Sequence, residues 1–226
     1  MHVTIALFDI DGTLLLAGGA GRRALEIAIG EVLGKSDEVS LESIAFAGRT
    51  DPWIIAQALE KYGVAADPRL IAEGLARYVA ALPGQLALAH AFEVKAGVVE
   101  LLRQLRGRRN LALGLGTGNA EPAAYAKLAR GGLESFFSFG GFGSDHVDRA
   151  EVLRIGLERG RKKAEGEDVR AVVIGDTPRD VEAARAIGAE CIAVETGSYD
   201  ASVLREAGAS LVVSDLRDPD VVEALQ

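Results

Sequence analysis

Cysteine, histidine and aromatic residues are scarce in this sequence of 226 residues. It has one cysteine, one tryptophan and three histidines, and aromatic residues make up 5% of the total. A single cysteine, Cys191, excludes an internal disulfide, and its place in the apolar run of residues 191–194 predicts a buried core side chain. The histidines, His2, His90 and His146, do not have the spacing of metal ligands, so we expect no histidine-based metal site.

Long hydrophobic runs and an excess of basic residues are also missing. No stretch approaches the roughly 18 apolar residues of a membrane-spanning helix. The first apolar run ends at Asp9 and has no basic segment before it, so we expect no signal peptide. The 33 acidic residues outnumber the 25 basic ones and give a net charge of −8, which disfavours a broad nucleic-acid-binding face. We therefore expect a cytoplasmic protein with no nucleic-acid or membrane partner.

The most informative stretch is the apolar run of residues 3–8, which stops at two carboxylates, Asp9 and Asp11, followed by Gly12. A short apolar run bounded by a glycine turn predicts a parallel strand buried on both faces. Sheets of such strands bind ligands at the carboxyl ends of their strands. Two carboxylates this close repel each other unless a cation lies nearby, and Mg²⁺ prefers oxygen ligands of this kind. For this stretch alone, a turn that carries two solvated acids is an equal alternative.

Helical periodicity dominates the next part of the chain. Apolar residues recur at helical spacing over residues 22–33, 52–62 and 68–81, and Pro83 with Gly84 is expected to end this region. Residues 15–90 therefore predict an all-helical insertion after the first strand.

Helices and strands are expected to alternate after residue 95. Apolar residues make up 49% and charged residues 26% of the chain, which is typical of a globular protein. Alternation of this kind predicts an α/β fold, in which a parallel sheet has helices on both faces. The expected helices cover residues 98–105, 121–130, 149–159, 178–187 and 201–207, and the expected strands cover residues 111–115, 136–139, 171–174, 192–194 and 211–213.

Two later strand ends carry polar residues. Thr117, Gly118 and Asn119 follow one strand, and a hydroxyl with free backbone N–H groups before a helix forms an anion site. A purely structural turn is the alternative there. Asp176 follows another apolar strand, and Asp180 lies in the first turn of the next helix, where a carboxylate also complements the helix N-terminus.

These stretches together resemble the motifs of the haloacid dehalogenase superfamily. Residues 8–14 are similar to its first motif, and residues 117–119, Arg149 and residues 175–180 follow in the order of the later motifs. The resemblance extends from about residue 5 to residue 214. It implies a three-layer, Rossmann-like parallel sheet core formed by residues 1–14 and 91–226, with an inserted all-helical cap domain over residues 15–90.

The resemblance also implies roles for individual residues. Asp9 is the expected nucleophile, Asp11 the acid and base, and Arg149 the cation that orients Asp9; the expected Mg²⁺ ligands are Asp9, Asp11, Asp176 and Asp180, and the expected substrate-binding residues are Thr117, Gly118, Asn119 and Arg49. The superfamily more often has lysine where Arg149 stands, and an arginine keeps the charge with a different geometry. Lys162 and Lys163 are therefore rival candidates for that role. Thr50, Asp51 and Trp53 are further candidates for substrate contacts from the cap, although a helix cap explains Asp51 and a core position explains Trp53.

The expected function is Mg²⁺-dependent hydrolysis of a small phosphorylated metabolite through an aspartyl phosphate, as in phosphoglycolate phosphatases and their relatives. Dehalogenation is disfavoured because the dehalogenases of the superfamily lack an acid at the position of Asp11. A sugar phosphomutase similar to β-phosphoglucomutase, which uses the same nucleophile, and a non-enzymatic phospho-aspartate switch are the alternatives. The expected partner is a small phosphorylated metabolite, and the chain is expected to be a monomer or a homodimer.

Overall fold

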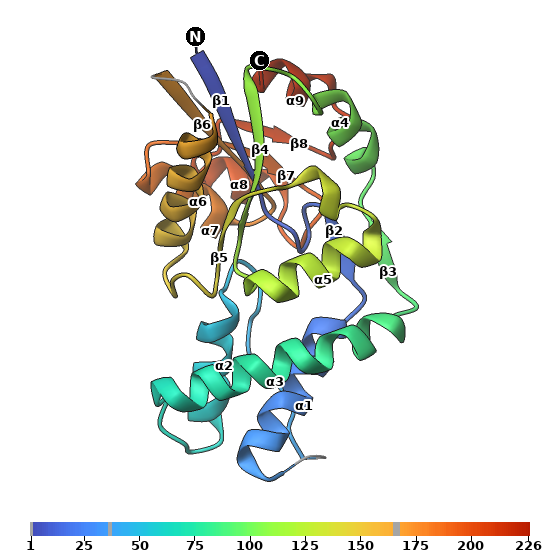
Figure 1. Cartoon of the computed structure of the whole chain (residues 1–226), viewed down its shortest axis with the longest axis vertical. Helices are drawn as coiled ribbons and strands as arrows, with labels where there is room; N and C mark the ends of the chain where they lie inside the picture. The colour runs from blue at the N-terminus through green and yellow to red at the C-terminus, as the bar shows by residue number, and fades with distance from the viewer. Residues whose placement is uncertain (1, 36–37, 165–167) are drawn as a thin grey trace.

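The core of the protein is a parallel sheet with helices on both faces (Figure 1). The computed structural model describes residues 2–35, 38–164 and 168–226. Its described strands form a six-stranded sheet in the order β5-β4-β1-β6-β7-β8, and all neighbouring pairs are parallel. The strands are β1 (His2–Phe8), β4 (Leu111–Thr117), β5 (Gly140–Phe142), β6 (Asp168–Gly175), β7 (Glu190–Val194) and β8 (Leu211–Val213).

The sheet separates two layers of helices, because β1 is apolar on both faces. Ile5 and Leu7 pack on one side in a cluster with residues of α6, α7 and α8, whereas Ala6 and Phe8 pack on the other side with α4, α5 and α9. This arrangement confirms the expected three-layer α/β fold. The helices of the two layers are α4 (Val98–Leu105), α5 (Glu121–Gly131), α6 (Arg149–Lys163), α7 (Pro178–Ala186), α8 (Ala201–Ala207) and α9 (Pro219–Ala224).

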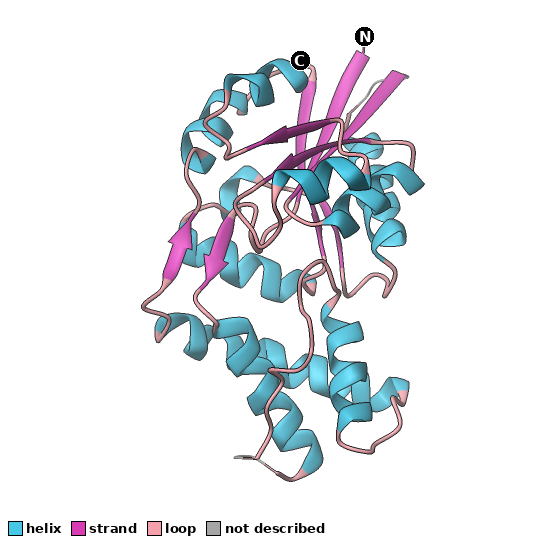
Figure 2. Cartoon of the chain, turned by 180° about the vertical axis from the view of Figure 1, so that it is seen from behind, coloured by secondary structure: helices cyan, strands magenta, loops and turns pink. Residues whose placement is uncertain are grey.

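The chain leaves the core and returns to it through a two-stranded ribbon (Figure 2). Strand β2 (Leu15–Ala17) pairs antiparallel with β3 (Phe92–Val94), and α1 (Ala20–Leu33), α2 (Asp51–Lys61) and α3 (Pro68–Ala87) lie between them in the chain. The sequence predicts only helices over residues 15–90, so the strand at Leu15–Ala17 differs from this expectation. In the pair Leu15 and Val94 the partner is 79 positions away in the chain, and a local periodicity does not reveal such a pairing.

Helix α3 also differs from its expected extent. The sequence predicts an end near Pro83, but the helix continues through this proline to Ala87. Tyr78, Leu82 and Leu86 lie four residues apart and are all buried, so the packing of one continuous face outweighs the backbone hydrogen bond that proline removes. In the part of the chain that the structure describes, no helix, α3 included, combines the length and the apolarity needed to cross a membrane.

Strand β5 begins later than expected. A strand is predicted over residues 136–139, but residues Glu134–Phe136 form a short 3-10 turn and the strand covers Gly140–Phe142. A Cβ atom on Gly141 would lie 1.8 Å from the carbonyl oxygen of Val152 in α6. The glycines therefore allow α6 to pack directly on β5, while the preceding phenylalanines serve as core side chains.

Cys191 lies in β7 and is 1% exposed. Burial raises the pKa of its thiol well above the ordinary value. The expected core position of Cys191 is confirmed. A buried thiol with a raised pKa forms little thiolate and is therefore unreactive.

Candidate active site

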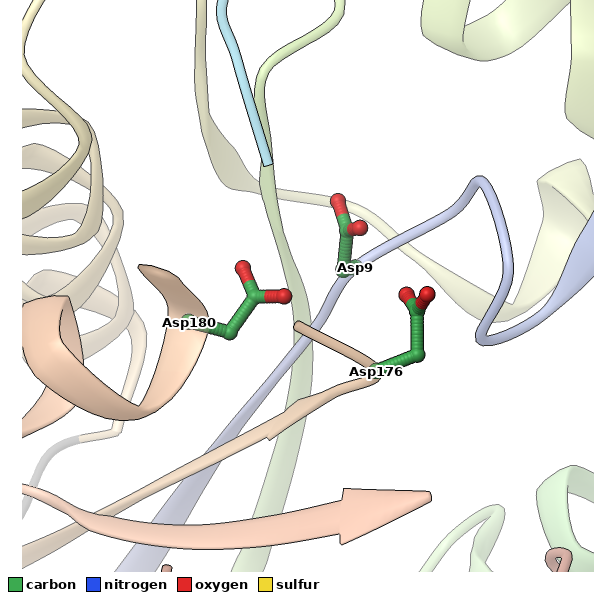
Figure 3. A group of neighbouring side chains, drawn as sticks. All are labelled: Asp9, Asp176 and Asp180. Atoms are coloured by element: carbon green, nitrogen blue, oxygen red, sulfur yellow. The ribbon is translucent and has the colours of Figure 1, made fainter. Parts of the chain in front are cut away.

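Carboxylates from three elements converge at the carboxyl edge of the sheet (Figure 3). Asp9 follows β1, Asp176 follows β6 and Asp180 lies in the first turn of α7; each offers an oxygen within 4.8 Å of the others. The register explains the first pair, because Phe8 pairs with Ile174 and the N–H of Asp9 donates to the carbonyl of Ile174 at 2.8 Å. All three side chains are buried. Asp9 and Asp176, which are far apart in the sequence, thus face the same space.

Burial makes this group of carboxylates electrostatically unfavourable by itself. It raises the pKa of Asp9 from 3.8 to about 6, although the nearby Arg149 lowers it, and Asp180 and Asp11 raise it further. The pKa of Asp176 is raised from 3.8 to about 8 by burial and by the charges of Asp180 and Asp9. A divalent cation would relieve both effects. The donor set consists of oxygen atoms only, so the residues present suit a hard cation.

Gly12 permits the close approach of the two strand ends. Its φ angle is 92°, in the region that favours glycine, and a Cβ atom at this position would lie 2.3 Å from Oδ2 of Asp176. The next residue, Thr13, donates its hydroxyl to Oδ1 of Asp176 at 3.0 Å. The glycine and threonine of the first motif therefore hold Asp176 against the turn that follows Asp9.

Arg149 connects the carboxylates from the start of α6. Its Nη2 lies 2.9 Å from Oδ1 of Asp9 and 2.7 Å from Oδ1 of Asp180, and it donates to the carbonyl of Gly116 at 2.8 Å. Its Nη1 is buried and has no hydrogen-bond partner among the described residues. Two nitrogens of the guanidinium, Nε and Nη2, are thus held by the protein, and Nη1 is available to a ligand.

The rival lysines lie at the opposite end of the same helix. Lys163 ends α6 and donates to the carbonyl of Ser138 at 2.7 Å, and Lys162 precedes it. At about 1.5 Å per residue, the helix places them roughly 20 Å from Arg149. Of these three candidates, Arg149 is the one that contacts Asp9.

Asp180 uses its oxygens within the protein. Oδ1 accepts from Nε and Nη2 of Arg149, and Oδ2 accepts from the N–H and the hydroxyl of Thr177. Thr177 in turn accepts from the N–H of Asp180, which completes a capping box at the start of α7. The side chain thus caps its helix and also fixes Arg149.

The carboxylate of Asp11 lies apart from the group formed by Asp9, Asp176 and Asp180. Its Oδ2 accepts from Nζ of Lys127 at 2.6 Å and from Nδ2 of Asn119 at 2.8 Å. The structure therefore does not bring this expected metal ligand together with the other three carboxylates.

Sequence reasoning missed Lys127, which is 4% exposed in α5. One signal is visible in retrospect. The buried residues of this helix are Ala123, Ala124, Lys127 and Leu128, so the lysine occupies a core-facing position of an amphipathic helix. A charged residue at such a position needs a partner, but the sequence does not identify Asp11 as that partner.

The three residues of the second motif do not all face the cavity. Gly118 and Asn119 line the cavity described below, whereas Thr117 is fully buried beneath Asn119 and is not among the lining residues. Oγ1 of Thr117 accepts from Nδ2 of Asn119 at 2.8 Å. The structure thus places this threonine where it orients Asn119.

The loop before α2 reaches the second motif. The N–H of Asp51 donates to the carbonyl of Gly118, and Oδ2 of Asp51 accepts from the N–H of Ala120 at the start of α5, both at 2.8 Å. Asp51 is expected to cap its own helix, but Thr50 occupies that position and Asp51 caps α5 instead. The carbonyl of Arg49 also packs on Gly118, where a Cβ atom would lie 2.0 Å from it.

Arg49 and Trp53 form one unit at the edge of the site. The guanidinium of Arg49 lies over the indole ring at 3.9 Å from its centre, and its Nε is buried without a partner among the described residues. Thr50 donates its hydroxyl to the carbonyl of Val147. Of these candidates for cap contacts, Arg49 and Asp51 line the cavity, and Thr50 and Trp53 do not.

A cavity of about 530 Å³ lies between the carboxyl edge of the sheet and the inserted helices. Its floor includes Asp9, Asp11 and Asp176. The inserted residues supply apolar walls, for example Leu25 and Ile54. Four cationic side chains also line it, namely Arg22, Arg49, Lys127 and Arg149. The site therefore combines a cluster of acids with several cations, as expected for an anionic ligand bound beside a metal ion.

Comparison with known proteins identifies relatives over most of the chain. A family model described as a haloacid dehalogenase-like hydrolase matches residues 3–188. A phosphoglycolate phosphatase from Synechococcus elongatus is 38% identical over 111 residues, which cover 49% of this chain and 50% of that protein. A phosphoglycolate phosphatase from Pseudomonas savastanoi pv. phaseolicola is 29% identical over 219 residues, which cover 94% of this chain and 77% of that protein.

Solved structures share the fold. A protein from Clostridium acetobutylicum, described as a predicted phosphatase, has a TM-score of 0.72 at 20% identity, with 99% of this chain and 100% of that chain covered. A candidate β-phosphoglucomutase from Thermotoga maritima has a TM-score of 0.62 at 24% identity, with 99% and 100% covered.

Proposed function

The chain belongs to the haloacid dehalogenase-like hydrolase family, and from this premise we propose that it is a Mg²⁺-dependent phosphatase that hydrolyses a small phosphorylated metabolite through an aspartyl phosphate on Asp9. The curated relatives that match most of the chain are phosphatases, which supports a phosphoric monoester hydrolase. The observation that carries the proposal is the environment of Asp9. Its carboxylate lies on the floor of the cavity, is held by Nη2 of Arg149 and shares a buried group with Asp176.

The first chemical step transfers the phosphoryl group to Asp9. A carboxylate oxygen of Asp9 forms a bond to phosphorus while the bond from phosphorus to the ester oxygen breaks, and Asp11 gives a proton to that oxygen so that an alcohol leaves. In the second step a water molecule attacks phosphorus and gives a proton to Asp11. The bond from phosphorus to Asp9 then breaks, which releases phosphate and restores the carboxylate.

Arg149 and the second motif bind the phosphoryl oxygens in this proposal. Nη1 of Arg149 is buried and unpartnered among the described residues, which leaves one donor for a phosphoryl oxygen. Gly118 and Asn119 line the cavity next to the start of α5, where backbone N–H groups favour anions. Thr117 supports them from below through its hydrogen bond with Asn119. Positioning and neutralisation of charge are the main requirements of phosphoryl transfer.

Asp9 and Asp176 would hold the Mg²⁺ ion directly. Asp180 adds negative charge next to them, but its oxygens already accept hydrogen bonds from Arg149 and Thr177, so it supports the site through Arg149. The carboxylate of Asp11 contacts Lys127 and Asn119 through Oδ2, and its side chain is 42% exposed, so it would remain accessible for proton transfer. When bound, the metal ion offsets the charge of the carboxylates and of the phosphoryl group.

The inserted helices act as a cap in this proposal. Helices α1, α2 and α3 contribute lining residues opposite the sheet, and the ribbon of β2 and β3 is the connection about which they move. A cavity of about 530 Å³ suits a small metabolite. Arg49 and Arg22 line its inserted side and would contact the part of the substrate beyond the phosphate.

The test is release of inorganic phosphate from a panel of phosphorylated metabolites, including 2-phosphoglycolate, with and without Mg²⁺. We expect turnover that requires Mg²⁺ and that Asp9→Asn abolishes. Asp145→Asn, which changes an acid that pairs with Arg159 outside the cavity, is the matched control and should retain activity. Release that is equal for Asp9→Asn and the unchanged protein would contradict the proposal. Conversion of β-glucose 1-phosphate to glucose 6-phosphate, without free phosphate, would identify a phosphomutase instead.

A further inference from the structure

Lys127, Asp11 and Asn119 form a closed triangle of hydrogen bonds. Nζ of Lys127 donates to Oδ2 of Asp11 and to Oδ1 of Asn119, each at 2.6 Å, and Nδ2 of Asn119 donates to Oδ2 of Asp11 at 2.8 Å. The three residues come from different segments, namely the turn after β1, helix α5 and the turn after β4. The lysine thus joins the first and second motifs of the site.

The lysine also determines which way the amide of Asn119 faces. An ammonium group only donates, so it selects the amide orientation in which Oδ1 points to Lys127. Nδ2 of Asn119 then faces Oδ2 of Asp11 and Oγ1 of Thr117. Without the ammonium, the opposite orientation of the amide would place its oxygen against the carboxylate of Asp11. Lys127 therefore acts on Asp11 both directly and through Asn119.

A structural role alone explains this lysine poorly. Burial of an ammonium costs free energy, and an apolar side chain at the same core-facing position of α5 would avoid that cost. The side chain of Lys127 is 5% exposed, whereas that of its partner Asp11 is 42% exposed. Lys127 is therefore not needed to neutralise a carboxylate that is buried in the core. The ammonium instead contacts Asp11, which is more exposed than the other acids named as lining the cavity, Asp9, Asp51 and Asp176.

The inserted helices cover the same ammonium. A Cβ atom on Gly21, in the first turn of α1, would lie 3.7 Å from Nζ of Lys127 and 3.8 Å from the hydroxyl of Tyr78 in α3. Both groups therefore lie close to the first turn of α1. This cover excludes water from Lys127 and strengthens its interaction with Asp11, because charges attract more strongly in a medium of lower polarity.

We propose that Lys127 is a positioning residue that, together with Asn119, holds the carboxylate of Asp11 toward the leaving group and away from the metal-binding carboxylates. The proposal rests on the proposed function, in which Asp11 gives a proton to the leaving oxygen. Nothing in the known motifs of the chain assigns a role to this lysine. Its position explains why the carboxylate of Asp11 lies apart from Asp9, Asp176 and Asp180.

The first arm of the test is a crystal structure of Lys127→Met next to that of the unchanged protein. We expect the carboxylate of Asp11 to leave its contact with Nδ2 of Asn119 in the variant and to keep it in Lys127→Arg. If Asp11 keeps the same contact in Lys127→Met, the proposal is wrong, whatever the activity of the enzyme. Lys127→Gln provides a second neutral variant if the methionine variant does not fold.

The second arm compares two substrates whose leaving groups differ in their need for a proton. The leaving group of 2-phosphoglycolate is glycolate, whose ester oxygen leaves as an alkoxide unless it is protonated, whereas the p-nitrophenolate of p-nitrophenyl phosphate departs without a proton. We expect Lys127→Met to lower kcat for 2-phosphoglycolate about 100-fold, in line with the loss of general acid catalysis, and to change kcat for p-nitrophenyl phosphate less than about threefold. KM should change little for either ester, and Lys127→Arg should restore part of the activity.

Two comparisons make this arm specific. The double variant Asp11→Asn with Lys127→Met should be no slower than Asp11→Asn alone, because residues that act as one unit are not additive. Lys163→Met, which changes a lysine at the far end of α6, should behave as the unchanged protein.

Equal losses for both esters, or multiplied losses in the double variant, would overturn the proposal. If the unchanged protein hydrolyses neither these esters nor any metabolite of the panel, while Asp11 moves in the variant structure, the proposed function fails and the effect of Lys127 on the position of Asp11 stands.

Discussion

At the scale of single residues, Arg149 holds buried carboxylates in place, and in the proposed function it also orients Asp9. It lies between the buried carboxylates of Asp9 and Asp180, which stabilise its positive charge. The sequence motif of the family more often has lysine in this place, but an ammonium lacks the fork that reaches Asp9, Asp180 and the carbonyl of Gly116 at once. In the proposed function, this arginine orients Asp9 and at the same time contacts Asp180 and Gly116.

Substitution of Arg149 by methionine should affect both stability and turnover. Two buried carboxylates would lose their cation, so we expect a loss in the free energy of unfolding of roughly 3 to 5 kcal/mol without metal. Turnover should fall by roughly 100-fold to 1,000-fold, because one donor to the phosphoryl group is removed. Urea unfolding and steady-state kinetics measure the two effects.

Arg159→Met is the control for this experiment, because Arg159 lies in the same helix and pairs with Asp145 at the surface. It should keep full turnover and lose less stability. Full turnover in Arg149→Met would show that another cation orients Asp9.

Asp51 should make the stability of the protein depend on pH. Burial raises its pKa from 3.8 to about 6, against the opposing effects of Lys127 and the N–H of Ala120. The folded state therefore binds this proton more tightly than the unfolded state. The stability that this group contributes is complete below pH 4 and is lost as the pH rises to about 6. The expected loss is on the order of 3 kcal/mol, since each pKa unit corresponds to about 1.4 kcal/mol.

Asp51→Asn removes the charge and keeps an oxygen that accepts from Ala120. Relative to the unchanged protein, this variant should gain stability between pH 4 and pH 7 by the amount given above, because its side chain never ionises. Chemical unfolding at several pH values measures the difference, and titrations common to both proteins cancel. Parallel pH profiles of the two proteins would contradict the expectation.

At the scale of the elements, the sequence predicts well what depends on local patterns. Apolar runs that end in acids locate β1 and β6, and periodicity locates α1, α2, α4 and α5 to within a few residues. Pairings between distant segments are not visible in this way. The ribbon of β2 and β3, the contact of Asp51 with α5 and the contact of Lys127 with Asp11 all join residues more than 65 positions apart. They depend on the folded arrangement and not on a local signal.

Helix α3 gives a prediction at this scale. Pro83 lies in its interior, where proline removes a backbone hydrogen bond, whereas Pro68 lies at its first residue, where proline is favoured. Pro83→Ala should therefore raise the free energy of unfolding by about 1 kcal/mol or more. Pro68→Ala, the matched control, should leave it unchanged or lower it slightly. Thermal unfolding of both variants is the measurement, and a loss of stability in Pro83→Ala would show that the helix requires its proline.

At the scale of the whole molecule, metal binding should couple to stability. The proposed ligands Asp9 and Asp176 lie at the ends of two adjacent strands in the centre of the sheet. Because they come together only when the sheet forms, a cation would bind the folded state and not the unfolded state. At a Mg²⁺ concentration of about 100 times its dissociation constant, the expected gain is about 2.7 kcal/mol. Asp176→Asn should lose most of this gain.

The gain should also depend on pH. Without metal, burial raises the pKa of Asp176 to about 8, so a proton occupies this carboxylate below pH 8 and competes with the cation. The affinity for Mg²⁺ should therefore fall about tenfold per pH unit between pH 8 and pH 6. Thermal unfolding with increasing Mg²⁺ at pH 6, 7 and 8 measures it. An affinity that does not change over this range would show that Asp176 is not a ligand.

The proposed function depends above all on the transfer of a phosphoryl group from the substrate to Asp9. The most direct measurement is to stop the reaction with acid during turnover, reduce the denatured protein with borohydride and analyse its peptides by mass spectrometry. An aspartyl phosphate is reduced to homoserine, so we expect homoserine at position 9 in the unchanged protein with substrate and Mg²⁺, and none without substrate. Homoserine at another acid, or its absence during rapid release of phosphate, would contradict the claim.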